Sequence, residues 1–101
     1  MIGYRFLQPA NEEITKASLF YEAASTGLGN DFLDDVQRVV DSLREHPYLG
    51  HGVDRNLRRM LLHRFPFSLI YSVEPDEILI VAIAHHGRRP GYWQDRFQLR
   101  C

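Results

Sequence analysis

The fold is decided by the stretch FSLIYSVEPDEILIVAIA at residues 67–84. Apolar and more polar side chains largely alternate over its first part, 67–73, which predicts a strand with one apolar face. Pro75, followed by an aspartate, favours a turn. The run at 78–84 is apolar throughout, as is typical of a strand buried on both faces. The whole stretch therefore predicts a hairpin of two antiparallel strands.

Two further strands are predicted in the rest of the chain. The mixed run at residues 57–65 comes directly before the hairpin and extends it to a three-stranded meander. Near the start of the chain, the short β-type run at residues 4–7 predicts an edge strand that stops at Pro9. The segment that contains Gly50 and Gly52 carries no strand pattern, and we interpret it as a loop.

Two amphipathic helices are predicted between the first strand and that loop. The first runs from Asn11, a suitable N-cap, to Ser25 and repeats apolar residues at helical spacing. The second carries a clearer apolar stripe and ends near His46, because Pro47 cannot continue a helix. The stripe consists of Phe32, Val36, Val39, Val40 and Leu43. A short break with two glycines joins the helices, so they should pack as an antiparallel hairpin.

The predicted element order is therefore β-α-α-β-β-β. This order predicts an α+β domain in which the helical hairpin packs on a mostly antiparallel sheet. A chain of 101 residues has the usual size of one domain, which we place at residues 1–101. Hydrophobic residues make up 45% of the chain and aromatic residues 12%, which argues against disorder.

The composition also excludes several classes of protein. The longest apolar run is far shorter than a membrane span, so we expect no membrane partner. No signal peptide is visible at the start of the chain. Cys101 is the single cysteine and leaves neither an internal disulfide nor a cysteine-based metal site. We therefore expect a cytoplasmic protein with no metal and no other cofactor.

The net charge of −1 hides an asymmetry along the chain. Residues 1–47 carry four basic and eight acidic side chains, whereas residues 48–101 carry eight basic and five acidic ones. All of the basic residues except Lys16 are arginine, whose planar fork binds phosphate and carboxylate groups. An acidic part and a basic part predict a polyanionic partner that meets the protein on one side.

The segment HHGRRPGYWQDR at residues 85–96 gathers basic and aromatic side chains at the end of the buried strand. His85 and His86 are adjacent, so on a strand they point to opposite faces and cannot chelate one metal ion together. RNA cleavage without a metal needs groups that move protons and cations that stabilise the phosphorane. Histidine and tyrosine supply the first, and arginine supplies the second. The same residues would equally suit the binding of a nucleic acid or an acidic peptide without chemistry.

Structural roles compete with functional ones for several of these side chains. Trp93 and Tyr92 could form a hydrophobic plug over the end of the sheet. One of the two adjacent histidines is expected to face the core and to be hydrogen-bonded there. Arg58 and Arg59 alternate along their strand, so one of them is expected to be a solvated charge or a partner of an acidic helix residue.

Four segments of the sequence together resemble the RelE/ParE superfamily of bacterial toxins, also known as a plasmid stabilisation family. They are EHP at 45–47, LLHRFPFSLIY at 61–71, ILIVAIAHH at 78–86 and RRPGYW at 88–93. The resemblance covers nearly the whole chain. It implies the toxin of a type II toxin–antitoxin pair, which a cognate antitoxin protein neutralises. RelE-like members cleave ribosome-bound mRNA, whereas ParE-like members inhibit DNA gyrase and lack the catalytic set.

Our first hypothesis is a metal-independent endoribonuclease that cleaves mRNA at the ribosome. By motif position, the resemblance assigns catalysis to Arg64, His85, His86, Arg88 and Tyr92. Binding of RNA or another target is assigned to Arg58, Arg59, His63, Arg89 and Arg96.

Two alternatives remain open. The chain lacks the lysines that the RelE branch carries on its middle strands, and its charge is near neutral, so a ParE-like inhibitor of DNA gyrase is the first. The second is a non-toxic module that only binds an antitoxin-like peptide, with apolar side chains of the partner filling pockets beside the helical hairpin.

Overall fold

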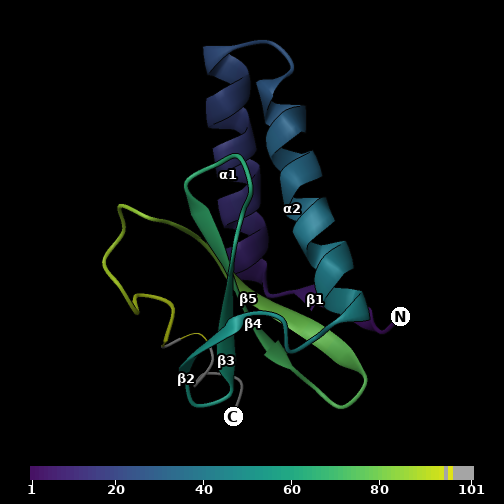
Figure 1. Ribbon diagram of the computed structural model, residues 1–101. Coiled ribbons are helices and arrows are strands. Elements are labelled where there is room, and N and C mark those ends of the chain that lie inside the picture. Colours follow the sequence, from purple (N-terminus) through teal and green to yellow (C-terminus); the bar gives the residue numbers. More distant parts are fainter. Residues whose placement is uncertain (95, 97–101) are drawn as a thin grey trace.

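The computed structural model describes residues 1–94 and residue 96, and it places two helices against one five-stranded sheet (Figure 1). The strands lie in the order β1-β5-β4-β3-β2, with β1 parallel to β5 and all other neighbours antiparallel. This is the predicted α+β architecture with one additional strand. The elements are β1 (Gly3–Phe6), α1 (Gln8–Ala24), α2 (Leu28–Glu45), β2 (His51–Asp54), β3 (Leu57–Leu61), β4 (Phe67–Val73) and β5 (Glu77–His85). The expectation for Cys101 lies outside the described residues.

The apolar stripe of α2 forms the centre of the core between the helices and the sheet. All five residues predicted for the stripe are buried: Phe32, Val36, Val39, Val40 and Leu43. The ring of Phe32 contacts three other aromatic rings, at centroid distances of 5.5 Å to Tyr21, 5.3 Å to Phe65 and 5.1 Å to Phe67. The periodicity of the sequence therefore identified the residues that hold the second helix on the sheet.

The first helix begins earlier than the sequence predicts. It starts at Gln8 rather than at Asn11, so the predicted N-cap is wrong. Pro9 lies in the first turn of α1, where a missing N–H removes no helical hydrogen bond and the fixed φ of proline suits the helix. The proline that ends the strand pattern is thus also part of the start of the helix.

The turn between the two helices depends on a pair of glycines. Gly27 has a φ of +89°, a left-handed conformation that glycine adopts without strain. Gly29 lies where the helices approach each other, and a Cβ atom there would stand 2.6 Å from the carbonyl oxygen of Ser18. The amides of both glycines donate to the carboxylate of Glu22 at 3.0–3.1 Å. The predicted helical hairpin is confirmed, and its turn is tied to α1 (Figure 1).

The sheet is buried on both faces. On β4, Leu69 and Tyr71 face the helices and Ile70 faces the other side, as the alternation of a strand requires. β5 is buried from Ile78 to Ala84, which confirms the prediction of a strand covered on both faces. Trp93 covers the second face and is only 8% exposed, so its predicted role as a hydrophobic plug is also confirmed.

The predicted loop around Gly50 and Gly52 contains the additional strand, β2, at the edge of the sheet. β2 pairs with β3, and its side chains are mostly exposed without alternation, so its sequence carries no strand pattern. The chain before it is held by the Tyr71 hydroxyl, which donates to the carbonyl oxygen of Pro47 at 2.8 Å and accepts from the amide of Gly50 at 3.0 Å. Tertiary contacts, rather than local preference, therefore place this strand.

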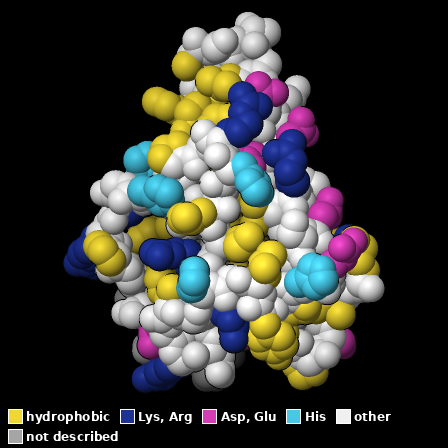
Figure 2. Space-filling model, viewed as in Figure 1, with side chains coloured by type: hydrophobic (Ala, Val, Ile, Leu, Met, Phe, Trp, Pro, Cys, Tyr) yellow, Lys and Arg dark blue, Asp and Glu magenta, His cyan; other side chains and the backbone are white. Residues whose placement is uncertain are grey.

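Acidic side chains lie along the flank of the molecule that α2 forms (Figure 2). Arginine side chains lie among these acids, and Arg38 and Arg64 form ion pairs there with Asp35 and Asp31. Within the part of the chain that the structure describes, neither helix is long and apolar enough to cross a membrane.

Candidate functional site

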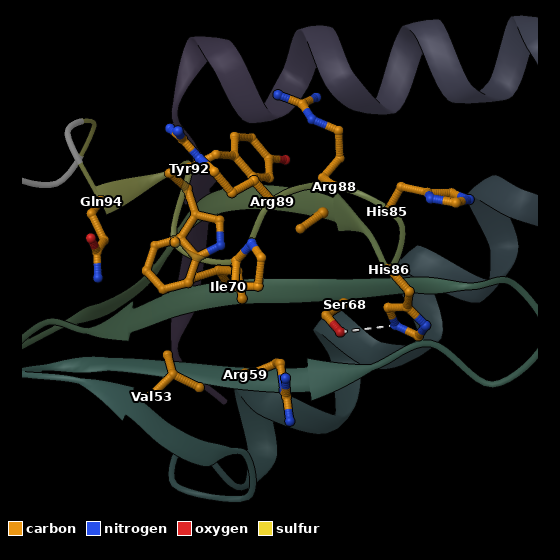
Figure 3. Close-up of a pocket in the computed structure, with 14 residues that line it drawn as sticks. Val53, Arg59, Ser68, Ile70, His85, His86, Arg88, Arg89, Tyr92 and Gln94 are labelled. Carbon is orange, nitrogen blue, oxygen red and sulfur yellow. Dashed lines mark hydrogen bonds between the residues drawn. The ribbon is translucent and has the colours of Figure 1, made fainter.

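A cavity of about 450 Å³ lies over the second face of the sheet, between the strands and the segment that follows β5 (Figure 3). We call residues 86–94 and 96 the tail. Six of the predicted site residues line the cavity, so the structure brings most of them together: Arg59, His85, His86, Arg88, Arg89 and Tyr92. Ile70, Ala84 and Trp93 supply its apolar part. Its described lining contains no carboxylate, which makes the cavity electropositive.

The two adjacent histidines point in different directions at the end of β5 (Figure 3). The ring of His85 meets the ring of Phe67 edge-on at 5.0 Å, and its Nδ1 accepts from the amide of Gly87 at 2.8 Å. Nε2 of His86 lies 3.1 Å from Oγ of Ser68. Both histidines are exposed, so the prediction that one of them faces the core is wrong. The reason is that β5 ends at His85 and the chain turns away from the core.

Tyr92 and Arg96 are both bound to one carboxylate on α1, that of Glu13. The Tyr92 hydroxyl donates to Oε2 of Glu13 at 2.5 Å, and the guanidinium of Arg96 donates to both carboxylate oxygens at 2.8 and 2.9 Å. Burial, followed by the hydrogen bond to Glu13 and its negative charge, raises the pKa of Tyr92 well above its usual range. The same hydrogen-bonded pairing raises the pKa of Arg96.

Arg88 continues this cluster toward the solvent. Its guanidinium lies 3.9 Å from the centre of the Tyr92 ring, a close cation–π contact. Arg88, His85 and Tyr92 also line a second cavity, of about 320 Å³, beside α1. Phe20 and Ala17 supply apolar surface to this second cavity. The tail therefore forms a wall shared by two cavities.

Arg64 and His63 lie apart from these residues. β3 ends at Leu61, earlier than predicted, and residues 62–66 form a turn toward α2. Buried Asp35 accepts the amides of His63 and Arg64, at 3.2 and 2.8 Å. Nη2 of Arg64 lies 3.7 Å from Oδ2 of Asp31. Neither residue lines either cavity, so the structure does not bring Arg64 together with the histidines and Tyr92.

Arg58 and Arg59 are separated by the alternation of β3, as predicted. Nη1 of Arg58 donates to the carbonyl oxygen of Gly50 at 2.7 Å, and its guanidinium lies 4.9 Å from the centre of the Tyr48 ring. These contacts hold the segment before β2 in place. Arg59 lines the first cavity instead.

Sequence reasoning missed three polar residues of this region. Glu13 binds the tail, Asp35 binds the turn before β4, and Ser68 lies against His86. Glu13 and Asp35 lie on the sides of α1 and α2 that face the rest of the protein. A single acid among apolar residues of a helix does not indicate in the sequence which group it binds. Among the described residues, no group of three or more histidine, cysteine and carboxylate side chains could hold a metal ion.

Comparison with known proteins gives a consistent family assignment. The model of the family described as the ParE toxin of type II toxin-antitoxin system, parDE, matches residues 4–90. No curated protein matches the chain. A solved structure described as the chromosomal ParDE TA system from P. aeruginosa is similar, with a TM-score of 0.61 and 21% identity over 84% of this chain and 96% of the other.

A second similar structure is that of a copper-bound mutant toxin from Helicobacter pylori. Its TM-score is 0.59, with 16% identity over 85% of this chain and 96% of that toxin. Identities this low establish a shared fold, whereas the family model rests on the sequence itself and spans most of it. The chain belongs to the family of ParE toxins of type II toxin–antitoxin systems.

Proposed function

We propose that the protein arrests bacterial growth by binding DNA gyrase and that it does not cleave mRNA. Membership of the ParE family favours this target, because the resemblance described above connects ParE-like toxins with gyrase and RelE-like toxins with mRNA. Both targets are cytoplasmic, so we place its action in the cytoplasm. A cognate antitoxin is the second partner that a type II toxin implies.

The observation that carries the proposal is the environment of Tyr92. Its hydroxyl is hydrogen-bonded to Glu13, and both burial and this carboxylate raise its pKa. A general acid or base is most effective when its pKa lies near the working pH. The pKa of Tyr92 is shifted further from the working pH, so its hydroxyl keeps its proton. Tyr92 is therefore poorly suited to the proton transfer that RNA cleavage requires.

The position of Arg64 supports the same conclusion. The nuclease hypothesis places Arg64 beside the reacting phosphate, together with Arg88 and the histidines. Arg64 lies against Asp31 of α2 and outside the cavity that His86 lines. The remaining exposed arginines and histidines suit the binding of an acidic surface, which needs complementary charge but no proton transfer.

The surface beside α1 is suited to a protein partner. Leu19 and Phe20 are 65% and 68% exposed, and Phe20 lines the second cavity together with the cations Lys16 and Arg88. Exposed apolar side chains next to charged ones are typical of protein interfaces. Such a surface would be covered by gyrase or by the antitoxin.

The proposal is tested by comparing two activities of the purified protein. We expect inhibition of DNA supercoiling by gyrase and no cleavage of mRNA in a translating ribosome preparation. Arg64→Ala should leave gyrase inhibition within a few-fold of the unmodified protein, because Arg64 lies outside both cavities.

Cleaved mRNA together with normal supercoiling would reject the proposal and restore the nuclease hypothesis. Normal bacterial growth at high expression without an antitoxin would instead favour the non-toxic binding module. Co-expression with the neighbouring reading frame is the control, because a cognate antitoxin should abolish the arrest.

A further inference from the structure

The last part of β5 has an open edge. β1 pairs with β5 only as far as Phe6, which lies opposite Ile80. Beyond that point, backbone N–H and C=O groups of β5 form hydrogen bonds with side chains instead of with a neighbouring strand. The amide of Ile83 donates to Oε1 of Glu13 at 3.0 Å, and the carbonyl oxygen of Val81 accepts from Nη1 of Arg96 at 3.3 Å. Glu13 and Arg96 thus continue the role of β1 along the edge.

The carboxylate of Glu13 joins three parts of the chain. It stands on α1, accepts the amide of Ile83 from β5, and accepts Tyr92 and Arg96 from the tail. The Glu13 and Arg96 side chains are only 16% and 19% exposed. Charge-assisted hydrogen bonds of this geometry are stronger than neutral ones, and partial burial limits their screening by salt.

The contact to Tyr92 reaches the lining of both cavities. Arg88 packs on the Tyr92 ring, and Trp93 follows it in sequence and covers the sheet. If Tyr92 left Glu13, the cation–π contact of Arg88 and the packing of Trp93 would lose their support. The shared wall of the two cavities would then be lost.

We propose that Glu13 is a positioning residue that docks the tail on α1 and β5 and thereby builds the wall shared by the two cavities. Glu13 also lines the second cavity, and the role assigned to it here is to hold Tyr92 and Arg96 in place. The effect of Glu13 on gyrase binding rests on the proposed function, whereas its effect on the docking of the tail does not.

The preceding residue provides a matched control. Glu12 carries the same charge on the same turn of α1, but it is exposed, and among the described residues its side chain accepts a hydrogen bond from Gln8 alone, at 3.2 Å. A general effect of negative charge near the start of α1 would act through both acids. A positioning effect acts through Glu13 alone.

The experiment compares Glu13→Gln with Glu12→Gln in the full chain. Trp93 is the only tryptophan, so its emission reports on the tail without further labelling. For Glu13→Gln we expect a red-shifted emission and greater quenching by acrylamide. The amide of Ile83 should exchange roughly 10- to 100-fold faster, as expected for the loss of a charged hydrogen-bond acceptor.

A spectroscopic signature distinguishes positioning from general loosening. The ¹³Cζ signal of Tyr92, titrated with pH, should show a pKa that moves down toward the ordinary value of 10 in Glu13→Gln. Glu12→Gln should leave the emission, the exchange and the titration unchanged. Arg96→Gln provides a second variant that weakens the same contact from the other side, should Glu13→Gln fail to fold.

Unchanged Trp93 emission and Ile83 exchange in both Glu13→Gln and Arg96→Gln would overturn the proposal. Equal effects of Glu12→Gln would also overturn it. Gyrase inhibition is measured separately with the same proteins. If the unmodified protein does not inhibit gyrase, the proposed function fails, while the tail measurements still decide the role of Glu13.

Discussion

The two faces of the sheet are covered in different ways. The helices cover one face with a continuous apolar core, in which Phe32, Leu43 and Leu69 are fully buried. The other face is covered by Trp93 and the tail, which is held by hydrogen bonds from Tyr92 and Arg96 to Glu13 and from Gln94 to Asp54. Apolar burial is spread over many residues, so its stabilisation is distributed. Glu13 accepts three hydrogen bonds from the tail, so a single substitution at this residue should be able to loosen the tail.

The largest effect is expected from breaking the apolar face. Phe32→Ala removes a ring in contact with Tyr21, Phe65 and Phe67, and should lower the free energy of unfolding by about 3–5 kcal/mol. Urea titration followed by circular dichroism measures this loss. The control is Phe20→Ala on the same hairpin, which should change it by less than about 0.5 kcal/mol because Phe20 is exposed. Equal losses would contradict the assignment of the core.

The helical face also contains one contact that depends on a carboxylate, that of buried Asp35. Asp35→Ala leaves the amides of His63 and Arg64 without their acceptor and should cost about 2–4 kcal/mol. Asp34→Ala is the matched control because Asp34 is its exposed neighbour on α2. The same urea titration measures both variants. A neutral Asp35→Ala would show that the turn at 62–66 does not depend on this carboxylate.

The tail should respond to alkaline pH through Tyr92. Its pKa is higher in the folded protein than the value near 10 of an unfolded chain, so folding retains a proton above pH 10. The stabilisation is complete below pH 10 and is lost as the pH rises toward the folded pKa. The slope reaches at most about 1.4 kcal/mol per pH unit for one group.

Tyr92→Phe removes this contribution, so its stability should fall less steeply between pH 9 and 11. Burial raises the pKa of Tyr71 and Tyr21 as well, and these residues act in both proteins. Only the difference between the two slopes therefore reports on Tyr92. Tyr48→Phe, at an exposed position, serves as the control substitution.

The smallest effect on stability is expected at Arg64. Its contact with Asp31 spans 3.7 Å between two half-exposed side chains, so Arg64→Ala should change the free energy of unfolding by less than about 0.5 kcal/mol. Thermal unfolding at low and high salt checks this expectation. A loss above 1 kcal/mol would mean that the turn relies on the Arg64 side chain as well as on its backbone.

Most of the helical face could be predicted from the sequence, because repeated apolar spacing records which residues face the core. The stripe of α2 and the buried run of β5 both follow from their periodicity. The start of α1 was misplaced because Pro9 is compatible with the end of a strand and with the first turn of a helix. β2 was missed because an exposed edge strand with glycine carries no alternation.

Much less of the candidate site could be predicted. The tail was identified as chemically distinct, and six of the predicted residues do line one cavity. Glu13, however, meets Tyr92 and Arg96 across most of the length of the chain, and no local pattern encodes such a contact. The turn at 62–66 directs Arg64 toward α2, which also depends on a distant partner, Asp35. The residue types in the sequence indicated which proton-transfer and charged groups are present. They did not indicate which arginines would form ion pairs with acids, as Arg96 does with Glu13 and Arg64 with Asp31.

The parallel pairing of β1 with β5 has a consequence for the order of folding. The helical hairpin and the meander β2-β3-β4-β5 join segments that are close in sequence, whereas residues 3–6 must find residues 77–80. Closing so long a loop is slow, because its entropic cost precedes any stabilising contact. The first strand is therefore expected to join the sheet last, on a meander that is already formed. The edge of β5 at residues 77–80 is free only during that interval, and it is then that another strand could pair with this part of β5 in place of β1.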